Sequence, residues 1–315
     1  MTLARRIVRA GTVAAVVAGV AALGGTPARA DTASPVATPV SGDFLAGLHA
    51  KETRDYSAAA EFLGAVLRDD SADFNLLQDG FIAMASAGRF DDAAAIAQRL
   101  KDLGGESDAM TIVLLLRDYK AGKLDDAIKT ADGMSDQGLA QYVGPLARAW
   151  LYVEAGRHDD AVKTLAPLAE LDGVKGLHGL HLGLVDELAK RPEDAAAAYQ
   201  KTADDPTLLS FRLAEVFGNF YERRGEWDKA KSVYEKFAAN FPDNGLIGIV
   251  RDRVAAKQKP KPLIGSARDG LAEALLNIAS VLSQNPGSDI ALMLTRASLD
   301  LRPDSAAAQD RKSVV

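Results

Sequence analysis

The sequence predicts an all-α fold built from stacked pairs of helices, and a repeated motif is the main reason. The heptapeptides AGRFDDA, AGKLDDA and AGRHDDA follow one another with their final alanines 34 residues apart. Such a period is typical of an array of repeated units rather than of one compact globule. Apolar residues also recur at helical spacing, and no strand-like alternation is evident. The period links six alanines, the last one residue late: Ala59, Ala93, Ala127, Ala161, Ala195 and Ala230.

Residues 211–244 show most clearly how one unit forms two helices. Gly225 is expected to end the first helix, because the residue after a helix often takes a left-handed conformation that suits glycine. The acids Glu226 and Asp228 then favour the start of the second helix, where negative charge complements the helix dipole. The glycines at the equivalent turns of the preceding units are Gly88, Gly122 and Gly156.

The same unit resembles the tetratricopeptide repeat, whose signature is Trp-x2-Leu-Gly-x2-Tyr, then Ala-x3-Phe, then Pro. Ala214 replaces the Trp and Phe217 the Leu, while Tyr234 stands for the Phe. The resemblance implies a right-handed α-solenoid of antiparallel helix pairs that binds proteins and needs no cofactor. The signature positions that match directly are Gly218, Tyr221, Ala230 and Pro242.

The domain organisation follows from the repeat and from its interruption. About six units are predicted over residues 42–245, followed by an extra helix and a Pro/Lys-rich connection over 246–265. A further, truncated helix pair is predicted over 266–309. We interpret the connection as an irregular link inside the solenoid, with a domain boundary as the alternative. Residues 310–315 equal the in-frame translation of a common sequencing adapter, so we expect a non-native tail, or else a genuine basic tail.

The N-terminal residues predict export. Three arginines precede an apolar run over 10–23, and a small-x-small site then predicts cleavage between Ala30 and Asp31. Residues 1–30 are therefore expected to be a signal peptide and 31–41 a flexible leader. Periplasmic or secreted localisation in a bacterium follows, with no integral membrane anchor after cleavage. A retained anchor is the alternative, although the apolar run is short for a membrane span.

Charge and residue types argue against several functions. The net charge of −6 disfavours nucleic acid as a partner, and a chain without cysteine has no disulfide or thiolate chemistry. His178 and His181 share one helix face but lack further metal ligands, so packing roles are favoured. The paired aspartates are assigned to helix dipoles and capping. No metal, cofactor or catalytic residue is predicted, and the chain is interpreted as a non-enzyme.

The resemblance places partners in a concave groove lined by the first helices of the units. The alternative is that these positions are ordinary core, displaced by an error in the helix register. The predicted groove residues are Ile112, Leu116, Tyr119, Lys120, Leu146, Trp150, Val153, Leu180, Leu184, Arg212, Asn219 and Arg223.

The favoured functional hypothesis is a scaffold that binds other envelope proteins or peptides in this groove. One alternative is a repeat module of a polymer-secretion or export pathway. A second is an accessory region of an enzyme whose catalytic part lies beyond residue 309.

Overall fold

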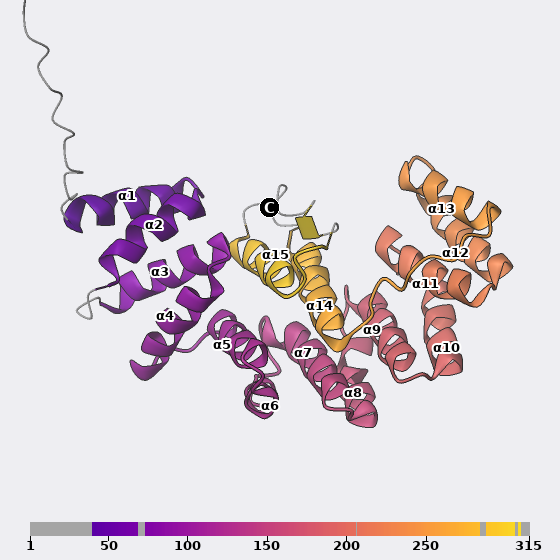
Figure 1. The fold of residues 1–315 in the computed structure, drawn as a ribbon, viewed down its shortest axis with the longest axis horizontal. Helices are drawn as coiled ribbons and strands as arrows, with labels where there is room; N and C mark the ends of the chain where they lie inside the picture. The colour runs from indigo at the N-terminus through magenta and orange to yellow at the C-terminus, as the bar shows by residue number, and fades with distance from the viewer. Residues whose placement is uncertain (1–39, 69–72, 206, 284–287, 306–307, 310–315) are drawn as a thin grey trace, which may run out of the picture. The chain divides into compact units, whose positions relative to one another are not determined.

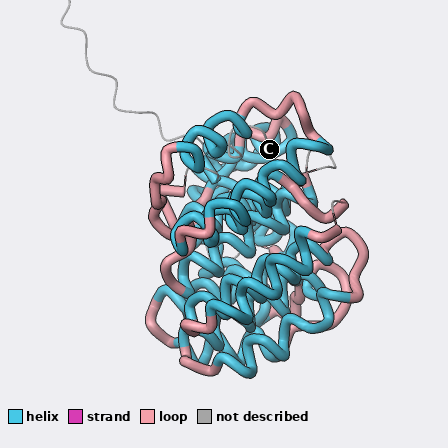
Figure 2. The backbone as a smooth tube through the Cα atoms, turned by 90° about the vertical axis from the view of Figure 1, so that its right-hand side faces the viewer, coloured by secondary structure: helices cyan, strands magenta, loops and turns pink. Residues whose placement is uncertain are grey.

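A computed structural model describes residues 40–68, 73–205, 207–283, 288–305 and 308–309. These residues form helices joined by loops, with no strand among them (Figure 2). The α-helices are α1 (Val40–Glu52), α2 (Tyr56–Val66), α3 (Phe74–Ala87), α4 (Phe90–Asp102), α5 (Asp108–Lys120), α6 (Leu124–Asp132), α7 (Ala140–Glu154), α8 (His158–Leu165), α9 (Lys175–Leu188), α10 (Pro192–Ala203), α11 (Phe211–Arg224), α12 (Trp227–Asn240), α13 (Leu246–Ala255), α14 (Ala267–Leu282) and α15 (Asp289–Leu301).

Helices α1 to α12 are arranged as six pairs in chain order, and each pair packs against the next (Figure 1). Helix α13 adds a single helix against α12. The all-α solenoid predicted from the sequence is therefore confirmed. The predicted signal peptide with its Ala30–Asp31 cleavage site, most of the predicted leader and the 310–315 tail lie outside the described residues.

Side-chain caps occur at some helix starts and not at others. Several first helices have a capping side chain, as where Ser107 and Ser210 accept hydrogen bonds from backbone N–H groups of the first turn. The second helices α4, α6, α8, α10 and α12 have no such capping bond. Their paired acids lie in the first turn instead, where they complement the helix dipole without capping it.

The repeated small residues lie where the helices approach closely. The recurring alanines are fully buried, each in the first half of its second helix, including Ala93, Ala127, Ala161, Ala195 and Ala230. Four repeat glycines have a left-handed backbone with φ of 72° to 83°, at Gly88, Gly122, Gly156 and Gly225. Gly218 packs against the ring of the buried Tyr234, and Tyr221 is buried nearby, whereas Pro242 is exposed just beyond α12.

We expect opposite effects from two glycine-to-alanine changes. A Cβ at Gly218 would lie 2.1 Å from Tyr234 Cζ, so Gly218→Ala should lower the free energy of unfolding by about 1–3 kcal/mol through overpacking. Nothing lies within 4 Å of a Cβ at Gly248, which is inside α13. Gly248→Ala should raise the free energy of unfolding by about 0.5–1 kcal/mol, because alanine is the better helix former. Urea denaturation measures both, and equal effects would contradict this packing.

The last helix pair does not extend the stack beyond α13. After α13 the chain turns back, so that α14 packs against α7 and α9 while α15 packs against α3 (Figure 1). Helices α3, α7 and α9 are all first helices of their pairs, and we call the side they form, together with α5 and α11, the first-helix face. The physical reason lies in α14 itself, since every residue from Gly270 to Ala279 is buried. A helix that is buried on all sides needs neighbours all round it.

Candidate interaction site

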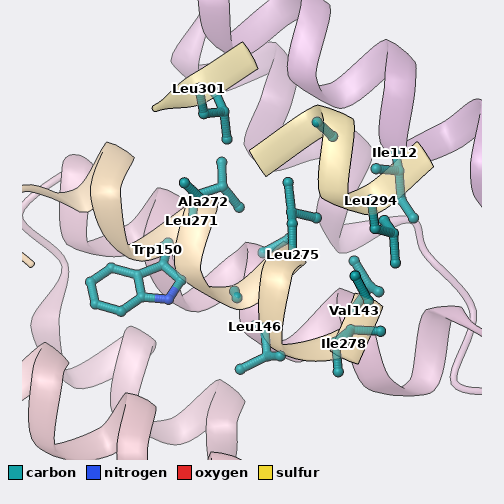
Figure 3. Close-up of a cluster of buried hydrophobic side chains, with 14 of the residues drawn as sticks. Ile112, Val143, Leu146, Trp150, Leu271, Ala272, Leu275, Ile278, Leu294 and Leu301 are labelled. Atoms are coloured by element: carbon teal, nitrogen blue, oxygen red, sulfur yellow. The ribbon is translucent and has the colours of Figure 1, made fainter. Parts of the chain in front are cut away.

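The predicted groove residues of α5 and α7 lie beneath the last helix pair. Ile112, Leu116, Leu146 and Trp150 are each no more than 2% exposed. In Figure 3, Ile112 lies beside Leu294, while Leu146 and Trp150 face the residues of α14. This part of the predicted groove is therefore covered by the chain's own helices α14 and α15.

Trp150 contacts α14 most closely. A Cβ added at Gly270 would lie 2.3 Å from the indole Cε3, so only glycine lets the α14 backbone approach the ring this far. At the other edge of the ring, Nε1 donates a hydrogen bond to His181 Nδ1 over 3.1 Å. The indole thus joins α7 to α14 by packing and to α9 by a hydrogen bond.

A buried polar cluster holds α14 against α9 and α11. Arg212 donates two hydrogen bonds to Glu273, from Nε to Oε1 over 2.8 Å and from Nη2 to Oε2 over 2.6 Å. Asn277, one turn further along α14, donates to Glu273 Oε1 over 3.3 Å, and its Nδ2 lies 3.4 Å from His181 Nε2. Burial raises the pKa of Glu273, but the charge and hydrogen bonds of Arg212 outweigh this and leave that pKa below its usual range.

The other predicted groove residues on α5, α7 and α9 also have partners within the chain. Lys120 Nζ lies 2.8 Å from Asp300 Oδ2 on α15, and Tyr119 donates to Glu154 Oε2 over 3.3 Å. Leu180 and Leu184 are buried, and Val153 packs partly buried against the core.

Two further groove residues lie on α11. Asn219 binds the segment that leads to α14, and Arg223 binds Asn219 and a residue of α9. Asn219 Nδ2 donates to the carbonyl of Lys261 over 2.9 Å, so the connection before α14 crosses this helix. Arg223 donates to Asn219 Oδ1 over 2.9 Å and also pairs with Glu187. The structure thus brings the predicted set onto one face, and Lys261, α14 and α15 of the same chain contact part of that face.

The feature that sequence reasoning missed is the position of α14. The sequence feature that could have indicated this position is the lack of a polar face on α14. Between Gly270 and Ala279 the only polar side chains are Glu273 and Asn277. Both belong to the buried cluster. A repeat helix at the edge of a stack would instead keep a continuous polar stripe toward water.

His181 makes the stability of this contact depend on pH. Burial lowers the pKa of His181 to about 4, whereas an unfolded histidine titrates near 6.5. Between these values the unfolded chain binds a proton that the folded chain does not, so stability falls as pH falls from about 6.5 to about 4. The expected loss is about 3 kcal/mol over that window. Protonated Nδ1 could also no longer accept the indole hydrogen bond.

Urea denaturation at a series of pH values measures this loss. His181→Gln is the control, because an amide does not titrate in this range. The variant should lose less stability than the natural chain between pH 6.5 and 4. Equal slopes for the two proteins would show that His181 is not the titrating group.

Another histidine forms a contact within the repeat array. His158, which the repeat assigns to structure, lies with Nε2 2.8 Å from Asp186 Oδ1. Within the described residues no group of three or more potential ligands is placed to hold a metal ion. In the same part of the chain, no helix combines the length and apolar character that crossing a bilayer requires.

A cavity of about 1050 Å³ remains open beside α14. Helices α11, α13 and α14 supply most of its lining, with Gly176 and Leu177 of α9 and Arg302, Asp304 and Ser305 after α15, and we call it the α11–α13–α14 cavity. Apolar side chains from all three helices line it, among them Phe211, Ile249 and Leu276. Leu246 and Ile249 at its edge are 48% and 62% exposed, and the cavity is therefore accessible from solvent.

Comparison with known proteins agrees with this architecture. Residues 211–244 match the tetratricopeptide repeat family. A tetratricopeptide repeat protein from Parabacteroides merdae is similar, with 13% identity, a TM-score of 0.50 and coverage of 82% of this chain and 98% of that chain. The C-terminal part of a TPR repeat-containing protein from Cytophaga hutchinsonii has 15% identity and a TM-score of 0.46, covering 85% of this chain and 98% of its own. No curated protein sequence matches the chain. Residues 211–244 thus match a tetratricopeptide repeat, and the chain shares the α-solenoid fold of the Parabacteroides merdae protein.

Proposed function

We propose that this chain is an exported, non-enzymatic scaffold that binds other proteins of a bacterial cell envelope. The observation that carries the proposal is the tetratricopeptide repeat at 211–244 within an α-solenoid, because such arrays typically bind proteins and carry no catalysis. The basic and apolar N-terminal residues support the exported location, and the net charge of −6 supports proteins rather than nucleic acid as partners.

Two measurements on the full chain test this proposal. The exported protein should appear in the periplasmic or secreted fraction with an N-terminus at Asp31. A tagged chain cross-linked in intact cells should then bind the same envelope proteins in reciprocal captures, with each partner tagged in turn.

The matched control removes residues 2–30 and leaves every described residue in place. That variant should remain in the cytoplasm and lose the envelope partners. Retention of the same partners without export, or the absence of any reciprocal partner, would contradict the proposed function.

A further inference from the structure

We propose that the α11–α13–α14 cavity binds the apolar face of an α-helix from a partner protein. This inference rests on the proposed scaffold function and names the surface and the type of binding segment. The part of the first-helix face that the resemblance assigns to partners is already covered by α14 and α15. The cavity lies next to the covered part and remains accessible to solvent.

Helix α13 presents apolar residues both to the core and to the cavity. Ile247 and Val250 are buried, and Val250 also lines the cavity. Leu246 and Ile249, three residues apart, lie along the cavity and remain largely exposed. Single exposed apolar residues are ordinary on protein surfaces, but a pair at helical spacing that lines a cavity marks a site for an apolar partner.

The opposite wall of the cavity is already suited to a helix. Leu276, Ser280 and Val281 of α14 line it. Phe211 contributes a further apolar surface from α11. The cavity is thus bounded by helices on two sides, which is the geometry of helix-in-groove recognition.

The charges around the cavity are already satisfied within the chain. Arg212 binds Glu273, Arg253 binds Glu222 with Nε 2.6 Å from Oε2, and Arg302 donates to the carbonyl of Leu263 over 2.9 Å. Among the described residues, no side chain lining the cavity has a buried polar atom without a partner. An anionic ligand would have to break these pairs, so the site favours an uncharged, apolar surface.

The neighbouring contact indicates a helix as the occupant. The same first-helix face already binds α14 through small and apolar residues, as where Gly270 lies against Trp150. The cavity lies beside α14 and extends from α11 to α13. A second helix lying beside α14 would bury Leu246 and Ile249 in the way that α14 buries the α7 residues.

The experiment uses the full chain with a photo-crosslinking amino acid in place of Ile249, produced in the native host. A second protein carries it in place of Leu103, which is 61% exposed and lies at the end of α4, outside the cavity. Cross-linked peptides are sequenced by mass spectrometry. We expect position 249, and not 103, to capture a segment with apolar residues at i, i+3 or i+4 and i+7.

The captured segment is then synthesised and titrated against three full-length proteins. Ile249→Asp should weaken its binding by about tenfold or more, whereas Leu103→Asp should leave the affinity nearly unchanged. Circular dichroism of both variants checks the fold, which substitutions at such exposed positions should preserve. The bound peptide should also gain helical signal.

Each other outcome overturns the inference. Capture of only a lipid, of a segment without helical periodicity, of the same segment from both positions, or of nothing at position 249 would exclude a helix site in this cavity. If envelope proteins bind the Ile249→Asp variant normally, the cavity inference fails while the scaffold function stands. If no envelope protein binds the natural chain, both fail.

Discussion

Replacing Trp150 with alanine is expected to lower the free energy of unfolding by about 3–5 kcal/mol. The indole is 1% exposed, lies against Gly270 and donates to His181. Its removal opens a cavity among α7, α9 and α14 and leaves the imidazole without its donor. Urea denaturation, followed by circular dichroism at 222 nm, measures the loss.

Trp227→Ala is the matched control for this prediction. Trp227 begins α12 and is only partly buried, so its loss should cost about 1 kcal/mol. The pair of variants also separates two interpretations of Trp150. If Trp150→Ala unfolds as easily as the natural chain but loses affinity for a partner, the indole belongs to an open groove and α14 does not cover it.

Removing the charge of Glu273 is expected to cost a similar amount. Glu273→Gln should lower the free energy of unfolding by about 2–4 kcal/mol, because Arg212, whose side chain is only 23% exposed, would lose its principal counter-charge. Glu215 would remain as the only carboxylate bound to Arg212, with Oε2 2.7 Å from Nη1. Denaturation by urea again measures the effect.

Two further variants test the cause. Glu235→Gln breaks the Arg251–Glu235 pair, whose side chains are both 46% exposed, and should change stability by about 1 kcal/mol at most. Combining Arg212→Met with Glu273→Leu removes both charges of the pair and should recover much of the stability lost in Glu273→Gln. A double variant as unstable as the single one would show that the contact depends on packing at position 273, not on an uncompensated charge.

The buried pair also explains how α14 is held in one register. The contact of Gly270 with the Trp150 ring already limits how far α14 can slide along the first-helix face, and the polar contacts limit it further. Arg212 and His181 each have one partner position on α14, at Glu273 and Asn277 respectively. Polar contacts of this kind specify one arrangement where apolar packing would permit several.

The repeat alone determined the helix pairs, because it is a local property of the chain. A buried alanine and acids in the first turn of the second helix recur at the 34-residue interval, and four units also have a glycine after the first helix. Each of these signals acts over one or two helical turns. These signals located α3 to α12 and the turns between them without any knowledge of distant residues. The resemblance to the tetratricopeptide repeat, carried from unit to unit by the 34-residue register, placed the groove residues on one face.

Only the tertiary structure decided what covers that face. The spacing from Ala230 to Ala291 is not a whole number of periods, which indicated an interruption but not its direction. Whether α14 continues the stack or returns to α7 depends on contacts such as Trp150 with Gly270 and Arg212 with Glu273, between residues 120 and 61 positions apart. The spacing of apolar side chains does not indicate which distant residues will pair. Helix α14 has the same apolar spacing whether it continues the stack or returns to α7.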